Sequence, residues 1–319
     1  MSEALDRDLS VIIPTRNRAE HLARCLDALR RQTLPPERFE VLVVDNGSEP
    51  SSLALARQAM ERTPFRATLL VEPRPGPAAA RNRGIENAHG HRILFIGDDI
   101  LASPQLLAEH LLAAERHTDC AILGFTDWAP DLRVTPFMLY LAPEHGAQFR
   151  YATIADPLNC GYQFFYASNI SLPRRWLDIE RFDETFPYAC LEDADLGYRL
   201  QKRGLEIVFH PLAMAYHDHL IRFRDFLKRM EQQGEGMAHL YRKFPELRSD
   251  PNMIPSDGYR ARFTLWRRLR FRAMVWLIAL ADPLRIPFPR RSYERLLEFQ
   301  FVRSYFAAFD RSSGSRAEG

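Results

Sequence analysis

Residues 9–45 read LSVIIPTRNRAEHLARCLDALRRQTLPPERFEVLVVD, and they contain the first clear pattern of strand, helix and strand. Its two continuous apolar runs, Leu9–Pro14 and Phe39–Asp45, are predicted to be strands covered on both faces. Asn17 and Glu20 are spaced as a capping box that would begin a helix between them. That helix would bury one face, formed by Leu22, Leu26 and Leu29. A strand, helix and strand joined by short links predict a parallel pair with a right-handed crossover.

The same alternation continues along the chain. The sequence predicts a helix over Ser51–Glu61, a strand over Thr68–Val71, a helix over Pro75–Ile85 and a strand over Ile93–Ile96. The second of these helices begins with proline and consists largely of small residues, which allow close backbone approach. The predicted class is therefore α/β, with a mostly parallel sheet flanked by helices on both faces, an architecture typical of nucleotide-binding proteins.

Composition excludes several classes of protein. With 46% hydrophobic and 26% charged residues, the chain is neither disordered nor membrane-embedded in character, and a net charge of +2 predicts no nucleic-acid partner. The four cysteines form no CxxC pair, so neither a zinc site nor a disulfide framework is indicated. The first eight residues lack the apolar core of a signal peptide, and the expected location is the reducing cytoplasm.

Two adjacent carboxylates, Asp98 and Asp99, follow the predicted strand Ile93–Ile96. Ligands of open α/β sheets bind outside the carboxyl ends of the strands, and a hard divalent cation prefers carboxylate oxygens while keeping positions for substrate phosphates. The pair therefore indicates a metal-diphosphate site. The alternative interpretation is an acidic, solvated turn after the strand.

The usual phosphate-binding loops are missing from the sequence. It has no G-x-x-x-x-G-K-[ST] loop and no G-x-G-x-x-G after the first strand, so metal and arginines would have to hold any phosphates. Asp45 ends the second predicted strand, where it would suit hydrogen bonds from a base or ribose. It could instead only initiate the turn at Asn46-Gly47.

Two later clusters are candidates for chemistry. Glu192, Asp193 and Asp195 begin a predicted helix that stops near Gly204; a carboxylate there could act as a general base, or the three acids could simply complement the helix dipole. His217 and His219 alternate along an extended segment, so they would point to one side of a strand. Either could complete a metal site, and both could equally be surface histidines.

Five segments in this order resemble family 2 of the inverting glycosyltransferases, which have the GT-A fold: Val11–Arg18, Val44–Ser48, Ala80–Ile85, Asp98-Asp99 and Glu192–Leu196. The resemblance covers about residues 9–220 and implies a role for each matching position. It assigns nucleotide binding to Pro14, Thr15, Arg16, Asp45, Arg81 and Asp98. It assigns the metal to Asp99 and His217, and the catalytic base to Asp193. It assigns the sugar and acceptor site to Ser168, Asn169 and Glu192. Gly97 stands at the first position of the D-x-D motif.

The resemblance implies an in-line displacement at the anomeric carbon of a nucleotide sugar. Asp193 would remove the proton of the acceptor hydroxyl, and Mg²⁺ or Mn²⁺ would neutralise the leaving diphosphate. The acceptor would be a saccharide, a lipid-linked molecule or another hydroxyl compound. Pocket candidates are Trp128, Gln163, Phe164 and Tyr188.

Two other classes remain as alternatives. A sugar-nucleotide pyrophosphorylase would share the sheet and the metal aspartates, but it should carry a glycine-rich phosphate loop after the first strand. A non-catalytic carbohydrate-binding or scaffold protein with a degenerate GT-A domain would accommodate Gly97, which departs from the motif. Turnover of a nucleotide sugar distinguishes such a protein from an enzyme.

The composition changes after residue 220, which divides the chain into a predicted catalytic domain, 1–220, and a helical extension, 221–319. Arg260–Arg291 contains nine arginines and one acidic residue. Within it, Ala273–Ala281 is an apolar run far shorter than the ~20 residues that cross a bilayer. The extension could pack on the core, form a homodimer, or hold the protein at the anionic inner face of a membrane. The tail after Arg311 is predicted to be disordered.

Overall fold

The computed structural model describes residues 7–143, 148–186, 190–249 and 265–314. Tyr188, a predicted pocket residue, lies outside these ranges. The chain forms two compact units, and each is described by itself. The first contains residues 1–132, 143–185 and 192–219; the second contains 133–142, 186–191 and 220–319. Two short internal segments thus belong to the second unit, in addition to the C-terminal region that composition distinguishes.

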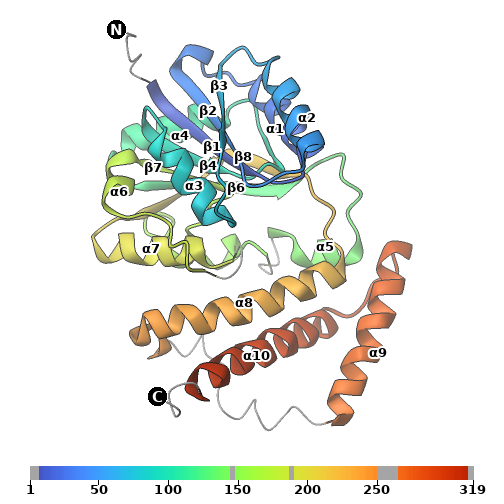
Figure 1. Cartoon of the computed structure of the whole chain (residues 1–319). Helices are drawn as coiled ribbons and strands as arrows, with labels where there is room; N and C mark the ends of the chain where they lie inside the picture. Colours follow the sequence, from blue (N-terminus) through green and yellow to red (C-terminus); the bar gives the residue numbers. More distant parts are fainter. Residues whose placement is uncertain (1–6, 144–147, 187–189, 250–264, 315–319) are drawn as a thin grey trace. The chain divides into compact units, whose positions relative to one another are not determined.

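The first unit is built on one eight-stranded mixed sheet (Figure 1) of order β3-β2-β1-β4-β7-β6-β8-β5. The strands are β1 (Arg7–Thr15), β2 (Phe39–Asp45), β3 (Arg66–Val71), β4 (Gly90–Ile96), β5 (Ile100–Ala102), β6 (Ala121–Trp128), β7 (Asn169–Pro173) and β8 (Ile207–His217). The pairs β1–β2, β1–β4, β2–β3 and β6–β8 are parallel, whereas β4–β7, β6–β7 and β5–β8 are antiparallel. The predicted mixed, mostly parallel sheet is confirmed.

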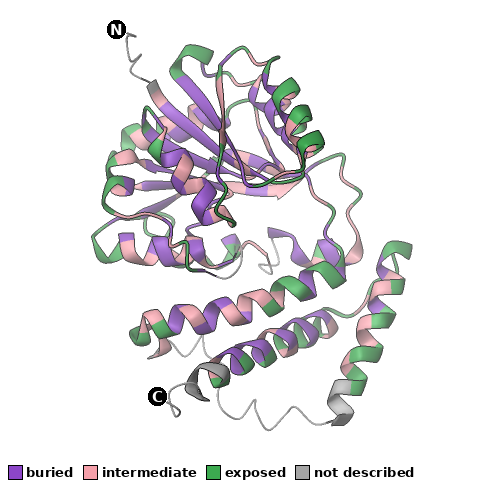
Figure 2. Cartoon of the chain, in the orientation of Figure 1, coloured by how far each residue is buried: buried purple, intermediate pink, exposed green. Residues whose placement is uncertain are grey.

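Helices cover both faces of this sheet, as the continuous apolar strands predict. Ile12 of β1 belongs to the core on one face, with residues of α3, α6 and α7, while Val11 and Ile13 belong to the core on the other face, with residues of α1, α2 and α4. The central strands are accordingly almost wholly buried (Figure 2). The helices are α1 (Ala19–Leu29), α2 (Pro50–Met60), α3 (Pro77–Glu86), α4 (Leu106–Arg116), α6 (Arg174–Ile179) and α7 (Glu192–Lys202).

The turn between β1 and α1 differs from the predicted capping box. The predicted leucines of α1 are buried, but the helix begins at Ala19, and Arg18 at the N-cap position makes no side-chain cap. Asn17 has a left-handed backbone, φ 54°, and its Oδ1 accepts a hydrogen bond from the Glu49 amide at 2.7 Å. Its own amide donates to the Ser48 hydroxyl. The asparagine therefore connects two loops at one edge of the sheet.

The helix α3 begins at Pro77, two residues later than predicted, after Gly76 with φ 114°. Its small residues do allow the expected close approach. A Cβ atom at Gly84 would lie 2.5 Å from Cγ2 of Ile12, so a larger residue there would push the helix away from β1. This packing fixes the position of Arg81 and Asn82, one turn earlier on the same helix.

The second unit is helical in its described part, with α5 (Pro136–Leu141), α8 (Phe223–Lys243), α9 (Leu265–Ala281) and α10 (Arg290–Gly314). Helices α8 and α10 pack closely, because a Cβ atom at Gly234 would lie 2.4 Å from the Phe301 carbonyl oxygen. Helix α10 continues to Gly314, so the predicted disordered tail is wrong for residues 312–314, and residues 315–319 are outside the described part. No helix among the described residues is long and apolar enough to cross a membrane.

Candidate functional site

The polar side chains predicted from the strand ends meet at one edge of the sheet. Because β1 and β2 are parallel, with Thr15 opposite Asp45, and β4 is parallel to β1, their carboxyl ends lie together. The hydroxyl of Thr15 donates a hydrogen bond to Oδ2 of Asp98 at 2.8 Å. The turn after β1 and the acidic pair after β4 are therefore in direct contact, although 83 residues separate them.

Arg18 bridges the two aspartates of this pair. Its guanidinium lies 3.1 Å from Oδ1 of Asp98 and 2.8 Å from Oδ2 of Asp99. Burial raises the pKa of Asp98 to about 6, and the Asp99 charge adds to this, while Arg18 and the Thr15 hydrogen bond oppose it. Arg18 was not predicted to belong to the site. The one feature of the sequence that could have indicated this role is that Arg18 is a basic residue in the polar turn after the first strand.

His217, the last residue of β8, approaches the same carboxylate. Its Nε2 lies 3.4 Å from Oδ2 of Asp99. Burial by itself would raise the pKa of Asp99, but His217 and Arg18 outweigh it and hold that pKa well below its usual range. The strand β8 ends at His217, so His219 lies just beyond it, but the two imidazole rings do lie on one side, with centroids 6.0 Å apart. His219 places Nδ1 3.4 Å from the guanidinium of Arg18.

These residues fit a divalent cation that shares its coordination with phosphates. The described residues hold no ready group of three acidic, histidine or cysteine ligands. One carboxylate and one imidazole nevertheless suffice where diphosphate and water oxygens complete the shell. Gly97 makes room for this carboxylate, since a Cβ atom there would lie 2.7 Å from Oδ1 of Asp99. The glycine at the first position of the D-x-D motif therefore allows the Asp99 carboxylate to lie where it does.

Asp45 shows the turn-forming contacts that the alternative interpretation predicts. Its Oδ2 accepts hydrogen bonds from the amides of Gly47 and Ser48, at 3.3 and 3.2 Å. The carboxylate is 3% exposed, at the edge shared with Thr15. Arg16, one residue after Thr15, is exposed. Two of the predicted nucleotide-binding residues, Asp45 and Arg16, therefore lie at the same edge of the sheet as Asp98 and Asp99. The turn orients the side chain of Asp45.

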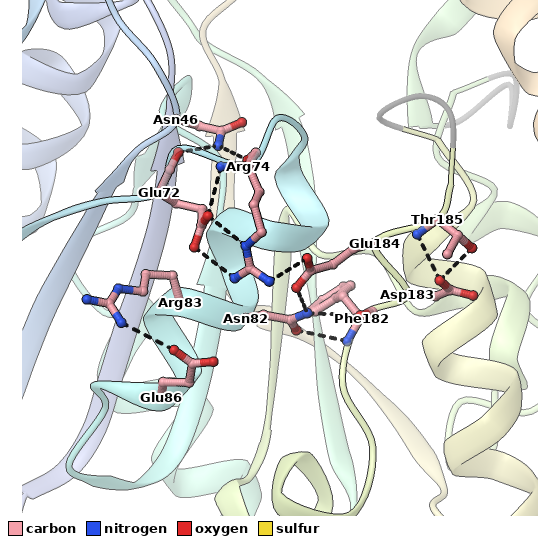
Figure 3. A network of polar contacts seen from close by, with 10 residues as sticks. All are labelled: Asn46, Glu72, Arg74, Asn82, Arg83, Glu86, Phe182, Asp183, Glu184 and Thr185. Carbon is pink, nitrogen blue, oxygen red and sulfur yellow. Dashed lines mark hydrogen bonds and ion pairs between the residues drawn. The ribbon is translucent and has the colours of Figure 1, made fainter.

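A polar network beside α3 was not predicted from the sequence (Figure 3). Arg74 makes two guanidinium contacts with Glu72, each 2.9 Å, and a third with Glu184 at 2.8 Å. Glu184 accepts a further hydrogen bond from Asn82 at 2.8 Å. Bidentate pairing of this kind gives geometric specificity as well as attraction. The network therefore connects the end of β3 and helix α3 to residues 182–185.

Asn46, which directly follows β2, extends this network toward the carboxyl end of that strand. Its amide donates to the carbonyl oxygens of Glu72 and Arg74 at 2.9 and 2.7 Å, and its Oδ1 accepts from the Gly76 amide at 2.8 Å. The side chain is 8% exposed. One asparagine therefore satisfies three backbone groups of the loop that leads into α3. From the sequence, Asn46 was predicted only to form the turn with Gly47.

The acidic cluster begins α7, directly after Leu191, whose φ of 68° is uncommon for a branched residue. Glu192 is 4% exposed and pairs with Arg81 of α3 at 2.7 Å. Asp193 keeps partial exposure. Burial, and then the charge of Glu192, raise the pKa of Asp193 above its usual range, against the opposing charge of Arg81. A carboxyl with a raised pKa has the proton affinity that suits a general base.

The third acid of the cluster has a structural partner. Asp195 is fully buried and accepts from Nε and Nη2 of Arg199, one turn later, at 2.9 and 2.7 Å. Arg199 also pairs with Glu180. Asp195 therefore stabilises α7, and the helix-terminus interpretation applies to it more directly than to Asp193.

The predicted sugar residues differ from each other in the structure. The Asn169 side chain is fully buried; its Oδ1 lies 2.9 Å from Nε2 of His110, and its amide donates to the carbonyl oxygens of Phe125 and Ala213. Its prediction as a sugar-contacting residue is corrected, because its Oδ1 contacts His110 of α4 and its Nδ2 bonds to carbonyl groups of β6 and β8. Ser168 keeps a buried hydroxyl without a partner among the described residues.

The chain belongs to glycosyl transferase family 2, because the model of that family matches residues 10–177, more than half of the chain. Among curated relatives, the uncharacterized glycosyltransferase YfnE of Bacillus subtilis is 37% identical over 61% of either chain. The chain spans between 33% and 61% of the length of the first curated relatives it matches.

Solved structures confirm the GT-A fold. A mannosyltransferase of Pyrobaculum calidifontis, PcManGT, in complex with GDP-Man and Mn²⁺, has a TM-score of 0.62 at 17% identity, covering 95% of this chain and 87% of that one. Residues 1–349 of TarS from S. aureus, in complex with UDP-GlcNAc, give 0.52 at 16% identity, covering 97% and 92%. At these identities the likeness establishes the fold.

Proposed function

We propose that this chain is an inverting, metal-dependent glycosyltransferase that moves a sugar from a nucleotide-diphosphate donor to a hydroxyl acceptor. The observation that carries this proposal is Asp193, a partly exposed residue at the start of α7 whose carboxyl pKa is raised by burial and by Glu192. The family to which the chain belongs supports glycosyl transfer, and the nucleotide-sugar complexes of PcManGT and TarS support the donor class. The proposed catalytic domain is residues 1–220.

In this proposal Asp193 accepts the proton of the acceptor hydroxyl as that oxygen attacks the anomeric carbon. Burial and the charge of Glu192 raise the pKa of Asp193, and the charge of Arg81 lowers it. Ser168, whose buried hydroxyl has no partner among the described residues, would bind the sugar or acceptor. A single displacement inverts the configuration at the anomeric carbon. The acceptor is a saccharide, a lipid-linked molecule or another hydroxyl compound.

At the strand edge, Asp45, Pro14, Thr15 and Arg16 would bind the base and ribose, and Asp98 would orient the donor. Asp99 and His217 would hold Mg²⁺ or Mn²⁺ beside the donor diphosphate. When bound, the cation would offset the negative charge that develops on the leaving diphosphate. Arg18 occupies the space between the aspartates, so its guanidinium would also be positioned to meet phosphate oxygens.

A thermal-shift screen tests the donor class. Nucleotide diphosphates and nucleotide sugars in the presence of Mn²⁺ should raise the melting temperature, because a ligand that binds only the folded state stabilises it by mass action. The expected gain is about 2.7 kcal/mol at a hundredfold excess over Kd. Nucleoside monophosphates are the matched control and should give a smaller shift. Equal shifts for mono- and diphosphates would contradict a diphosphate site.

The raised pKa of Asp193 predicts a specific pH dependence of stability. A carboxyl whose pKa is raised on folding contributes stability below its unfolded pKa and loses it as pH rises through the folded pKa. Asp193→Asn cannot ionise. We therefore expect the melting temperature of this variant, relative to the wild type, to rise from about pH 4 to about pH 7. A difference that stays constant over this range would contradict the raised pKa.

A further inference from the structure

Helix α9 presents an apolar face outward, and this face has no role in the proposed chemistry. Six of the fourteen exposed large hydrophobic residues in the described part of the chain fall within residues 269–286. They are Leu269, Trp276, Leu277, Leu280, Leu284 and Ile286. Trp276 is 59% exposed and Leu280 is 64% exposed, so more than half of each residue's surface is in contact with solvent. Figure 2 shows the described part of α9 as mostly exposed or intermediate.

The exposed residues lie on one side of the helix. Leu269, Ala273, Trp276 and Leu280 recur at spacings of three and four residues, so they form one stripe. The opposite face is already used within the second unit. There Ile278 is fully buried, and the Phe271 and Phe299 ring centroids are 4.7 Å apart. Helix α9 is therefore apolar on its inner face, where packing explains it, and again on its outer face.

Arginines flank the outer stripe. On a helix of 3.6 residues per turn, Arg270 and Arg272 fall on its two sides, and both are exposed. The guanidinium of Arg224, on α8, lies 3.9 Å from the ring centroid of Trp276. The one acid between Arg260 and Arg291, Asp282, is 4% exposed and accepts a hydrogen bond from the Phe137 amide at 2.8 Å. It offsets little of the positive charge that the surface presents.

We infer that the outer face of α9, with the exposed Leu284 and Ile286 that follow it, docks on an anionic lipid surface. An apolar stripe bordered by arginines matches a bilayer interface, where acyl chains receive the apolar side chains and headgroup phosphates receive the guanidinium groups. If a second copy of this chain occupied the face instead, the arginines of the two copies would be buried against each other. The inference does not depend on the proposed transfer chemistry.

Co-sedimentation of the full chain with vesicles tests the inference. Vesicles of phosphatidylcholine mixed with phosphatidylglycerol should bind the protein at low salt, while vesicles of phosphatidylcholine alone should bind it much less. Added salt should weaken the binding, because the arginine contribution is screened. Equal binding to both vesicle types, or no binding to either, would overturn the inference.

Variants locate the contact. Trp276→Ser with Leu280→Ser should reduce the partition coefficient by roughly tenfold or more, given the area that these side chains would bury. Arg270→Gln with Arg272→Gln should reduce it by roughly fivefold per arginine on anionic vesicles only. All four side chains are on the surface, so folding should survive, and an unchanged melting temperature checks this.

Matched controls come from the first unit. Leu158→Ser with Leu212→Ser removes two leucines of comparable exposure, 59% and 65%, and should leave vesicle binding unchanged. Arg31→Gln with Arg57→Gln removes two exposed charges of α1's flank and α2 and should have little effect. Losses in the controls as large as those in the α9 variants would overturn the assignment to this face.

Trp276 also reports its own position. Lipids with brominated acyl chains should quench tryptophan fluorescence in the wild type, and Trp276→Phe should remove most of that quenching while binding persists. Undiminished quenching when Trp266→Phe accompanies Trp276→Phe would overturn the assignment, because a tryptophan outside α9 would then lie in the lipid. A second result would also overturn it. If sedimentation velocity shows a concentration-dependent dimer that the double variant Trp276→Ser with Leu280→Ser dissociates, a second copy of the chain occupies the face.

Discussion

Asp193→Asn should lower the rate of sugar transfer by roughly 10²–10⁴-fold, the contribution typical of a general base. The amide keeps the size of the side chain but cannot accept the acceptor's proton. Stability should not fall at neutral pH, because the ionised carboxyl has a raised pKa and its charge is therefore unfavourable in the folded state. Donor binding should persist. Steady-state rates, nucleotide affinity and melting temperature together measure these effects.

The two neighbouring acids are the internal controls. Asp195→Asn breaks a buried ion pair with Arg199, and Glu192→Gln breaks one with Arg81. Removing one partner of a buried pair costs about 3–5 kcal/mol, so both variants should lose stability. Asp195→Asn should keep catalysis once folded. Normal turnover by folded Asp193→Asn would place the base elsewhere.

Asp99→Asn should remove the Mn²⁺ dependence of nucleotide-diphosphate binding. The substitution keeps the shape of the side chain and replaces an oxygen ligand with an amide nitrogen. We expect diphosphate affinity in Mn²⁺ to fall by at least the roughly 10–100-fold that even outer-shell partners of metal sites contribute. Isothermal titration calorimetry with Mn²⁺ and with a chelator measures the difference between the two conditions.

Asp98→Asn is the matched control for the metal assignment. Asp98 lies next to Asp99 and shares the Arg18 bridge, but it also accepts a hydrogen bond from Thr15. Its substitution should weaken binding less and should retain the difference between Mn²⁺ and chelator. A Mn²⁺ dependence that persists in Asp99→Asn, or that disappears only in Asp98→Asn, would contradict the assignment.

Much of the first unit could be predicted because its signals are local. Continuous apolar strands such as Phe39–Asp45 specify burial on both faces, and β2 has these same bounds. Polar residues directly after parallel strands must gather at one edge, and Thr15 and Asp98 do so. The family motifs fall on these same positions, since they occur where the chain leaves the sheet.

The errors concern contacts between segments far apart in the chain. Nothing near Arg18 indicates that its guanidinium spans two aspartates some 80 residues later. The Glu72–Arg74–Glu184 network likewise depends on how residues 182–185 return to α3. Asn169 was predicted to contact a sugar from the family resemblance alone, yet its amide is fully satisfied by His110 and two carbonyl groups.

The stereochemistry of donor cleavage is the sharpest test of a single displacement assisted by Asp193. In the presence of Mn²⁺ and without acceptor, water can take the place of the acceptor hydroxyl, and proton NMR at early times identifies the first anomer released from a nucleotide sugar. A single displacement assisted by Asp193 predicts that this sugar has the opposite anomeric configuration to the donor, and that Asp193→Asn releases it far more slowly. Release with retained configuration, or at an unchanged rate in the variant, would contradict the account.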